Sequence, residues 1–262
     1  MGSEFDGGYI VPKKIIDHSD VLLSFGVGAD ICFEMDFLEH NKEVKLICLD
    51  GSTSPKFVLK EITKHLYDHI LNFIATGIRL KFSGDFCHKI YTTLGYLGFY
   101  KDFKRVTQNR RCTYINQFIS NKSEGKCISV DDLFGKSILQ KSERIFVKMD
   151  IEGYEYLTLW YFRPHFERIS GFVVEFHDLG LQWPHFIPMT DMLFESFDLV
   201  HIHGNNWAHN IPETSIPETL ELTFVHKRYR DANVCPNTNT YPMPGLDAPC
   251  NPKYPDLKLT FE

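Results

Sequence analysis

The sequence predicts an α/β protein built on a mostly parallel sheet with helices on both faces. Two observations carry this prediction. Short apolar runs alternate along the chain with segments of helical spacing, and several runs lack a polar face, as in strands buried inside a parallel sheet. These runs also end in acidic or other polar residues, which is typical of the edge where open α/β sheets bind ligands.

The first two strands are predicted at Val21–Gly26 and Lys45–Asp50. A turn, Val27–Asp30, follows the first strand and leads into apolar residues at near-helical spacing. The second strand is followed by Gly-Ser-Thr-Ser and a proline, which are start signals for a helix over Pro55–Phe73. Residues from about 75 to 130 are aromatic and basic, and are expected to hold an insertion and one or two sheet strands.

The most informative strand lies at residues 145–151. It is apolar except for Lys148 and ends in three carboxylates, Asp150, Glu152 and Glu155, before a helix-like segment. Ligands of open α/β sheets bind beyond the carboxyl ends of the strands. These acids are therefore expected to hold a ligand or a metal ion.

Three further strands complete the pattern. Gly171–His177 and Phe197–Asn206 end in polar residues and are separated by a helix-like segment, Pro188–Phe197. Glu218–His226 alternates between apolar and polar residues and is expected to pair antiparallel with the strand before it. Six of the thirteen prolines follow residue 231, which predicts a domain over residues 1–230 and an irregular arm over 231–262 packed on it.

Composition narrows the function classes. A formal net charge of −6 argues against nucleic acid or an anionic membrane as partner. The chain has no apolar run of ~18 residues, so no membrane span is expected. The amino terminus lacks the pattern of a signal peptide, and the seven cysteines include no Cys-x-x-Cys pair, so a reducing, cytoplasmic setting is expected. Cys235 and Cys250 share the arm and so have the chance to approach each other, but two free thiols are expected.

A candidate cofactor turn, Phe25–Gly28, lies where the first strand meets a helix. Glycines there let backbone amides approach a cofactor, and a helix amino terminus favours negative charge. Asp50 ends the next strand, where an acid accepts both hydroxyls of an adenosine ribose in folds of this kind. Together they predict a nucleoside cofactor; the alternative is an ordinary strand-to-helix turn.

A second constellation comprises Asp150, Glu175, His177 and His203, each at the carboxyl end of a strand, on three successive strands. Carboxylates from neighbouring strand ends suit Mg²⁺, Mn²⁺ or Ca²⁺, and imidazole favours Mn²⁺ or a later transition metal. The alternative is that Glu175 and His177 merely bond backbone groups at a loop entrance.

Four further side chains are candidates for acceptor binding. Asn205 and Asn206 either orient a polar acceptor or form a simple turn. Trp183 and Trp207 fall in loops past strand ends, where they stack on a sugar ring or close the edge of the core.

Several motifs resemble those of FkbM-type methyltransferases. Val147–Glu155 resembles the signature (V/L)-K-x-D-(I/V)-E-G-x-E, and Val173–His177 resembles the (I/V)-x-E-x-H element of the next strand. The resemblance covers nearly the whole chain and is closest to a branch found in bacterial surface-carbohydrate gene sets. Further elements similar to that branch are Asp6–Tyr9, Ser24–Gly28, His203–Asn206 and the proline-rich arm.

The resemblance implies a class I S-adenosylmethionine-dependent methyltransferase fold, with a seven-stranded sheet whose last strand is antiparallel. It also implies that Gly26, Gly28 and Asp50 hold S-adenosylmethionine, with Phe25 and Asp30 beside them. The glycine turn departs from the common pattern acid-x-Gly-x-Gly-x-Gly. Serine stands at position 24 in place of the acid, and Asp30 replaces the third glycine, so that either Asp30 or Glu34 is left to face the methionine end.

The implied reaction is O-methylation of a carbohydrate, either a nucleotide-linked sugar or the sugar of a polymer such as a capsule polysaccharide. The sulfonium methyl is already activated, so the protein must align it with a hydroxyl and remove the proton. Asp150 and Glu175 are expected to bind a divalent ion or the acceptor, with Glu152 beside them. His177 or His203 is expected to take the proton.

Three alternatives remain at this stage. The acceptor could be a small molecule other than a sugar, or the chain could bind carbohydrate without catalysis, which the altered glycine turn favours. A metal-dependent hydrolase would use the histidines and carboxylates but leave the glycine turn and Asp50 without a role.

The aromatic segment between residues 90 and 120 offers either a lid over the site or a subunit contact, and the second role would give a homodimer.

Overall fold

The computed structural model describes residues 1–54, 57–60, 62–64, 67, 84–231 and 240–259. The helices are α1 (Lys13–His18), α2 (Cys32–His40), α4 (Gly84–Thr107), α5 (Val130–Phe134), α6 (Ser137–Gln140), α7 (Glu155–Thr158) and α8 (Leu179–Ser196), with 3₁₀ helices η1 (Leu159–Arg168) and η2 (Lys227–Tyr229). The strands are β1 (Val21–Phe25), β2 (Lys45–Leu49), β3 (Cys112–Ile115), β4 (Phe118–Ser120), β5 (Cys127–Ser129), β6 (Ile145–Met149), β7 (Ile169–Phe176), β8 (Phe197–Gly204) and β9 (Leu220–His226).

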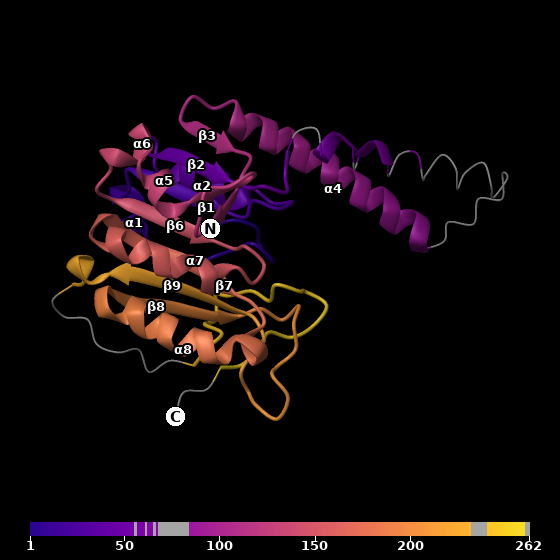
Figure 1. Cartoon of the computed structure of the whole chain (residues 1–262). Helices are drawn as coiled ribbons and strands as arrows, with labels where there is room; N and C mark the ends of the chain where they lie inside the picture. The colour runs from indigo at the N-terminus through magenta and orange to yellow at the C-terminus, as the bar shows by residue number, and fades with distance from the viewer. Residues whose placement is uncertain (55–56, 61, 65–66, 68–83, 232–239, 260–262) are drawn as a thin grey trace, which may run out of the picture.

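One seven-stranded sheet, in the order β3-β2-β1-β6-β7-β9-β8, organises the chain (Figure 1). The strands from β3 to β7 pair in parallel, and β9 pairs antiparallel with both β7 and β8. The predicted α/β class, the mostly parallel seven-stranded sheet and the antiparallel last strand are therefore confirmed. The expectation that the polar strand ends lie on three successive strands is wrong for the last of them, because β9 lies between β7 and β8.

Helices cover both faces of this sheet, and side chains that alternate along each strand fill two cores. In β1, Leu22 points to the face covered by α1, α2 and the end of α4, whereas Leu23 points to the face covered by α5, α7, η1 and α8. All five residues of β1 and β6 are buried, as the continuous apolar runs predict.

The insertion supplies one strand of the main sheet, β3, and a separate two-stranded parallel sheet, β4-β5. The long helix α4 extends beyond the edge of the main sheet (Figure 1). The short helix α5 is capped at its amino terminus by Ser129, whose hydroxyl accepts a hydrogen bond from the Asp132 amide at 3.1 Å. Of the helix expected at Pro55–Phe73, the described residues 57–60, 62–64 and 67 are helical, and residues 68–73 lie outside the described part.

The helix before β8 begins nine residues earlier than expected, at Leu179 instead of Pro188. Pro184 and Pro188 both lie inside α8, although proline lacks the amide that an inner helical turn uses. Trp183 therefore lies on a helix and not in a loop. The apolar side chains Leu179, Phe186 and Leu193, which pack into the core, hold this helix against the sheet.

The arm from residue 240 to 259 runs along the carboxyl end of β8 and is held by polar contacts. The amide of Asn206 donates to the carbonyls of Asn251, Tyr254 and Pro255 at 3.0–3.2 Å, and its oxygen accepts from the Asn251 amide at 2.6 Å. His201 contacts Asp247 at 2.7 Å. Cys250 is buried and free, while Cys235 lies outside the described residues.

No helix among the described residues is long and apolar enough to cross a membrane.

We predict that Asn206→Ala loosens the arm. The change leaves several buried backbone groups of the arm without a partner, which costs about 2 kcal/mol. In limited proteolysis, cleavage between residues 240 and 259 should become faster, whereas Asn210→Ala, on the exposed loop between β8 and β9, should behave as the unaltered chain. Equal cleavage rates for both variants would contradict the role assigned to Asn206.

Candidate active site

A cavity of about 910 Å³ opens at the carboxyl ends of β1, β2 and β6. Its walls come from the turn after β1, the acid after β2, the β3–β4 connection with β4, and the turn after β6. A segment near the amino terminus, Asp6–Gly7, also contributes. Residues predicted to bind the cofactor are all in its lining, namely Phe25, Gly26, Gly28, Asp30 and Asp50.

The glycine turn approaches the end of β6 so closely that no side chain fits at Gly26. This residue has φ of +73°, and a Cβ atom there would lie 1.5 Å from the carbonyl oxygen of Asp150. The buried ammonium of Lys148 donates to the Gly26 carbonyl at 2.9 Å and fixes the turn from the β6 side. The cofactor turn and the acidic turn after β6 are thus in direct contact.

Asp50 organises the same turn from the β2 side. Its Oδ2 accepts from the amides of Val27 and Gly28 at 3.0 and 2.9 Å, and its Oδ1 accepts from the amides of Ser52 and Thr53 at 2.7 and 2.8 Å. Burial raises the pKa of Asp50, but the hydrogen bond from the Ser52 hydroxyl, together with those from the backbone amides, outweighs it and the pKa is lowered overall. Asp50 is therefore an anion that holds the turn.

The acid missing at position 24 is supplied from α2. The hydroxyl of Ser24 donates to the carboxylate of Glu34, which is fully buried and lies 4.0 Å from the Lys148 ammonium. Asp30 instead lies just before α2, where its Oδ1 accepts from the Cys32 amide at 2.7 Å, and its Oδ2 accepts from the Ser3 hydroxyl. Of the two acids left open by the sequence, Asp30 lines the cavity and Glu34 lies behind the turn.

A chain of hydrogen bonds joins the end of β6 to that of β7. The Tyr9 hydroxyl lies 3.3 Å from Asp150 Oδ2 and 3.0 Å from Glu175 Oε2, and Asn205 donates to Glu175 Oε1 at 2.8 Å. Burial, followed by the charges of Asp150 and Glu221, raises the pKa of Glu175 well above its usual range. Asp150 faces the cavity, whereas Glu175 lies behind it.

His177 lies next to this chain and is surrounded by carboxylates. Its Nδ1 is 3.2 Å from Glu155, and its Nε2 is 3.7–3.9 Å from Glu152, Glu175 and Asp150. Burial alone would lower the pKa of His177, but the hydrogen bond and charge of Glu155 and the other acids raise it to about 9. His177 is therefore an imidazolium at neutral pH.

His203 does not join the other three residues of the predicted constellation. It lines a smaller cavity of about 340 Å³, between the amino-terminal segment and the arm. Its Nδ1 lies 2.9 Å from Glu221 and its Nε2 lies 3.0 Å from Asp256. Burial would lower the pKa of His203, but the two acids raise it to about 9, and both ring nitrogens are engaged.

The predicted acceptor residues separate in space. Glu152 lines the large cavity with an exposed side chain, and Asn205 lies in the hydrogen-bond chain. Asn206 is committed to the arm, so its amide is not free to orient an acceptor. Trp183 stacks on Phe186 of α8, and Trp207 is 58% exposed; neither lines the two cavities.

The predicted metal pair, Asp150 and Glu175, does not form one ligand group. Among the described residues, the ligand atoms of Asp150 lie with those of Glu152 and His177, and those of Glu175 lie with Asp6 and Glu221. The hydroxyl of Tyr9 lies between the two groups. Each contains three oxygen or nitrogen ligands, so each has the chemistry to hold a divalent ion.

Three residues of the site, Tyr9, Lys148 and Glu221, were not assigned a role from the sequence, and Lys148 belongs to the quoted motif Val147–Glu155. Tyr9 belongs to the quoted motif Asp6–Tyr9, which was the signal that could have marked it. Glu221 carried no signal, because only the antiparallel direction of β9 brings the beginning of that strand to the carboxyl edge of the others.

No protein-family model matches the chain, and no curated protein sequence matches it. Similar solved structures include a precorrin-6y C5,15-methyltransferase from Geobacter metallireducens GS-15, with a TM-score of 0.39 and 12% identity over 82% of this chain and 84% of that one. A fibrillarin pre-rRNA processing protein of Methanococcus jannaschii gives a TM-score of 0.40 and 6% identity, over 83% of this chain and 70% of that one.

A third similar structure is TrmK of M. capricolum in complex with S-adenosylhomocysteine, with a TM-score of 0.36 and 13% identity, over 82% of this chain and 65% of that one. Similarity at this level does not bear on the reaction or its acceptor. The fold rests on the chain's own strand order and on its antiparallel β9.

We predict that Gly26→Ala destabilises the protein far more than Gly28→Ala. Both glycines have positive φ, which costs an alanine about 1–2 kcal/mol. Only at Gly26 would the added Cβ meet backbone, whereas nothing lies within 4 Å of the one at Gly28. Urea unfolding should show a free-energy loss at least about 2 kcal/mol larger for Gly26→Ala. Similar losses for the two variants would show that the turn does not pack against β6 in this way.

Proposed function

We propose that this chain is an S-adenosylmethionine-dependent methyltransferase that methylates a hydroxyl of a carbohydrate, carried on a nucleotide or in a polysaccharide. One observation carries the proposal. The large cavity lies beside the turn that contains Gly26 and Gly28 and next to Asp50, and it continues to the acidic end of β6. We call the part beside the glycine turn and Asp50 the donor half, and the part at the end of β6 the acceptor half. Methyl transfer from an adenosine-bearing donor to a hydroxyl requires the two halves to adjoin.

The donor half offers one set of residues for the adenosine of the donor and another for its sulfonium. Asp50 is an anion at the end of β2, placed for the ribose hydroxyls, and the aromatic ring of Phe118 lines the wall that β4 contributes. Asp30 and Asp150 give that part of the cavity negative charge, which favours a cationic sulfonium. Lys148 also lines the cavity and keeps the two turns together.

The acceptor half is polar, and hydrogen bonds and ion pairs fix the positions of its side chains. Asp150 faces the cavity and accepts from Tyr9, so it is placed to bind an acceptor hydroxyl. His177 lies 3.9 Å from Asp150, where its positive charge stabilises the carboxylate, and loss of its proton would make it the base. Glu175 lies behind the cavity wall, where it contacts Tyr9 and Asn205 and helps to fix the position of Tyr9.

The carbohydrate acceptor and the FkbM assignment rest on the motif resemblance and on the polar character of the acceptor half. As an alternative to the His177 base, a Mg²⁺ or Mn²⁺ ion fits best in the group of Asp150, Glu152 and His177, because two of its members line the cavity; His177 would then bind the ion as a neutral imidazole. The net charge and the cavity chemistry favour a small molecule or nucleotide-sugar over nucleic acid. A homodimer, a cytoplasmic location and a division at residue 230 remain parts of the proposal.

We predict that the chain binds S-adenosylmethionine with micromolar affinity in titration calorimetry. Asp50→Asn removes the charge that holds the turn and faces the ribose, and should weaken binding by roughly tenfold or more. Asp191→Asn, an exposed acid on α8, is the matched control and should bind as the unaltered chain. Absence of any binding heat would favour a carbohydrate-binding scaffold without catalysis.

Mass spectrometry of candidate nucleotide-sugars with donor, with and without chelator, tests the acceptor. Asp150→Asn should lower turnover on the order of 100-fold, with a much smaller loss of donor binding because Asp30 remains. Methylation of a non-sugar molecule would retain the enzyme class and overturn the acceptor. Metal-dependent cleavage without donor would indicate a hydrolase instead.

We predict a rising pH–rate profile if His177 is the base. The pKa of His177 is raised to about 9, so its neutral form increases about tenfold per pH unit up to that pH. kcat/KM should rise accordingly and level off above pH 9. His177→Gln should flatten the profile, and His185→Gln, an exposed histidine on α8, should leave it unchanged. A flat profile for the unaltered chain would exclude His177 as the base.

A further inference from the structure

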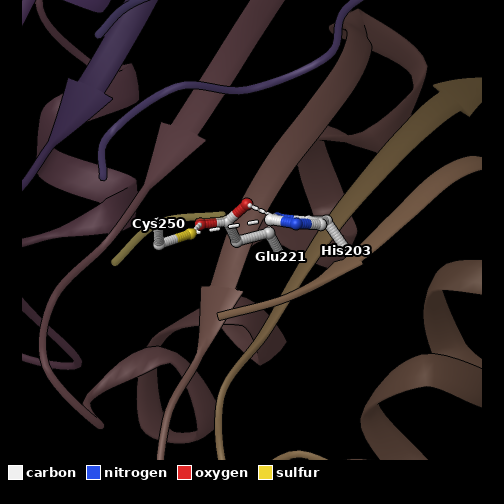
Figure 2. Close-up of side chains that lie close together, drawn as sticks. All are labelled: His203, Glu221 and Cys250. Atoms are coloured by element: carbon white, nitrogen blue, oxygen red, sulfur yellow. Dashed lines mark hydrogen bonds and ion pairs between the residues drawn. The ribbon is translucent and has the colours of Figure 1, made fainter. Parts of the chain in front are cut away.

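Three metal-ligating side chains meet in the interior at the edge of the small cavity, outside the proposed donor site. They are His203 at the end of β8, Glu221 at the beginning of β9 and Cys250 of the arm, and all three are buried. Figure 2 shows Cys250 and His203 on either side of the Glu221 carboxylate. The chain positions of these residues are far apart, so only the folded arm and sheet bring them together.

The separations between the ligand atoms suit a tetrahedral ion. His203 Nδ1 lies 2.9 Å from Glu221 Oε2, Cys250 Sγ lies 3.3 Å from Glu221 Oε1, and Sγ lies 3.9 Å from Nδ1. A tetrahedral zinc ion bound at ordinary bond lengths separates sulfur, nitrogen and oxygen ligands by roughly 3.3–3.6 Å. The observed distances lie on both sides of this range, so small side-chain movements would complete the geometry.

The second nitrogen of His203 is held as a metal-binding histidine requires. Its Nε2 lies 3.0 and 3.1 Å from the two oxygens of Asp256. Histidine ligands commonly donate their other ring N–H to a carboxylate, which fixes the ring and raises its basicity. Asp256 therefore leaves Nδ1 as the ligand atom, directed at Glu221 and Cys250.

Charge balance also permits a divalent ion. Carboxylates only accept hydrogen bonds, so both nitrogens of His203 donate, and the thiol of Cys250 donates to Glu221. An ion with two positive charges that replaces the Nδ1 proton and the thiol proton leaves the net charge of the cluster unchanged. Glu221 and Asp256 then compensate the same charge as before.

We propose that His203, Glu221 and Cys250 form a binding site for a divalent transition metal ion, of which Zn²⁺ suits the ligands best. Nitrogen, oxygen and thiolate ligands together select zinc over hard cations such as Mg²⁺. His203 and Glu221 also line the small cavity, so the fourth coordination position faces that space and holds water or a ligand. Cys250 makes the ion a link between the arm and the sheet.

Metal analysis of the whole chain tests the site without any assay of methylation. After loading with Zn²⁺ and desalting, the unaltered chain should retain one zinc per chain, and excess Mg²⁺ should not displace it. Cys250→Ser should lose the ion, and Cys32→Ser, a half-buried cysteine of α2 outside this cluster, should keep it. Asp256→Asn should weaken binding by about 10- to 100-fold.

Loading with Co²⁺ provides a spectroscopic test. The unaltered chain and Cys32→Ser should show a thiolate-to-cobalt charge-transfer band in the near ultraviolet, and Cys250→Ser should not. If Cys250→Ser does not fold, the anomalous signal of zinc in crystals of the unaltered chain locates the ion, and the proposal requires a peak between Sγ of Cys250 and Nδ1 of His203. No retained zinc, an unaffected Cys250→Ser or a peak elsewhere would overturn it. S-adenosylmethionine binding is measured separately, so either proposal can fail alone.

Discussion

The buried ammonium of Lys148 connects the two halves of the candidate active site. It donates to the Gly26 carbonyl at 2.9 Å and lies 3.9 Å from Asp150 and 4.0 Å from Glu34. Burial lowers the pKa of Lys148, but the charges of Glu34 and Asp150 outweigh it, so the pKa is raised and the ammonium stays charged. A buried ion pair of this kind fixes one arrangement more than it adds stability. Here it holds the turn that follows β1 against the turn that follows β6.

A surplus of carboxylates at the carboxyl edge of the sheet explains much of the site's chemistry. Several carboxylates lie close to each of the cations Lys148, His177 and His203. The two histidines consequently have pKa values of about 9. A basic histidine at neutral pH is thus a consequence of the surrounding acids. Binding of a cationic ligand in the large cavity would offset part of this surplus, whereas a metal ion at the cluster around Cys250 would replace two protons and leave the net charge there unchanged.

Sequence patterns predicted the features that local chemistry determines. The apolar run that ends in Asp150 was predicted as a buried strand with acids at its end, and it forms β6. Gly26 was predicted to let the backbone approach a cofactor, and in the structure the turn also packs against the Asp150 carbonyl, where a Cβ has no room. The patterns failed where contacts between segments far apart in the sequence determine the position of a residue. His203 was assigned to the acids of β6 and β7, but β9 separates it from them, and Tyr9 reaches the site from the amino terminus. Trp183 was misplaced because prolines inside α8 concealed its first two turns.

The central claim is that the cavity beside Gly26 binds the adenosine of a methyl donor next to Asp150. A crystal structure with bound S-adenosylhomocysteine measures this most directly. The account predicts the ribose within hydrogen-bonding distance of Asp50, the adenine near Phe118 and the homocysteine sulfur directed toward Asp150. Nucleoside density in another place, or a cavity that stays empty at saturating ligand, would contradict it.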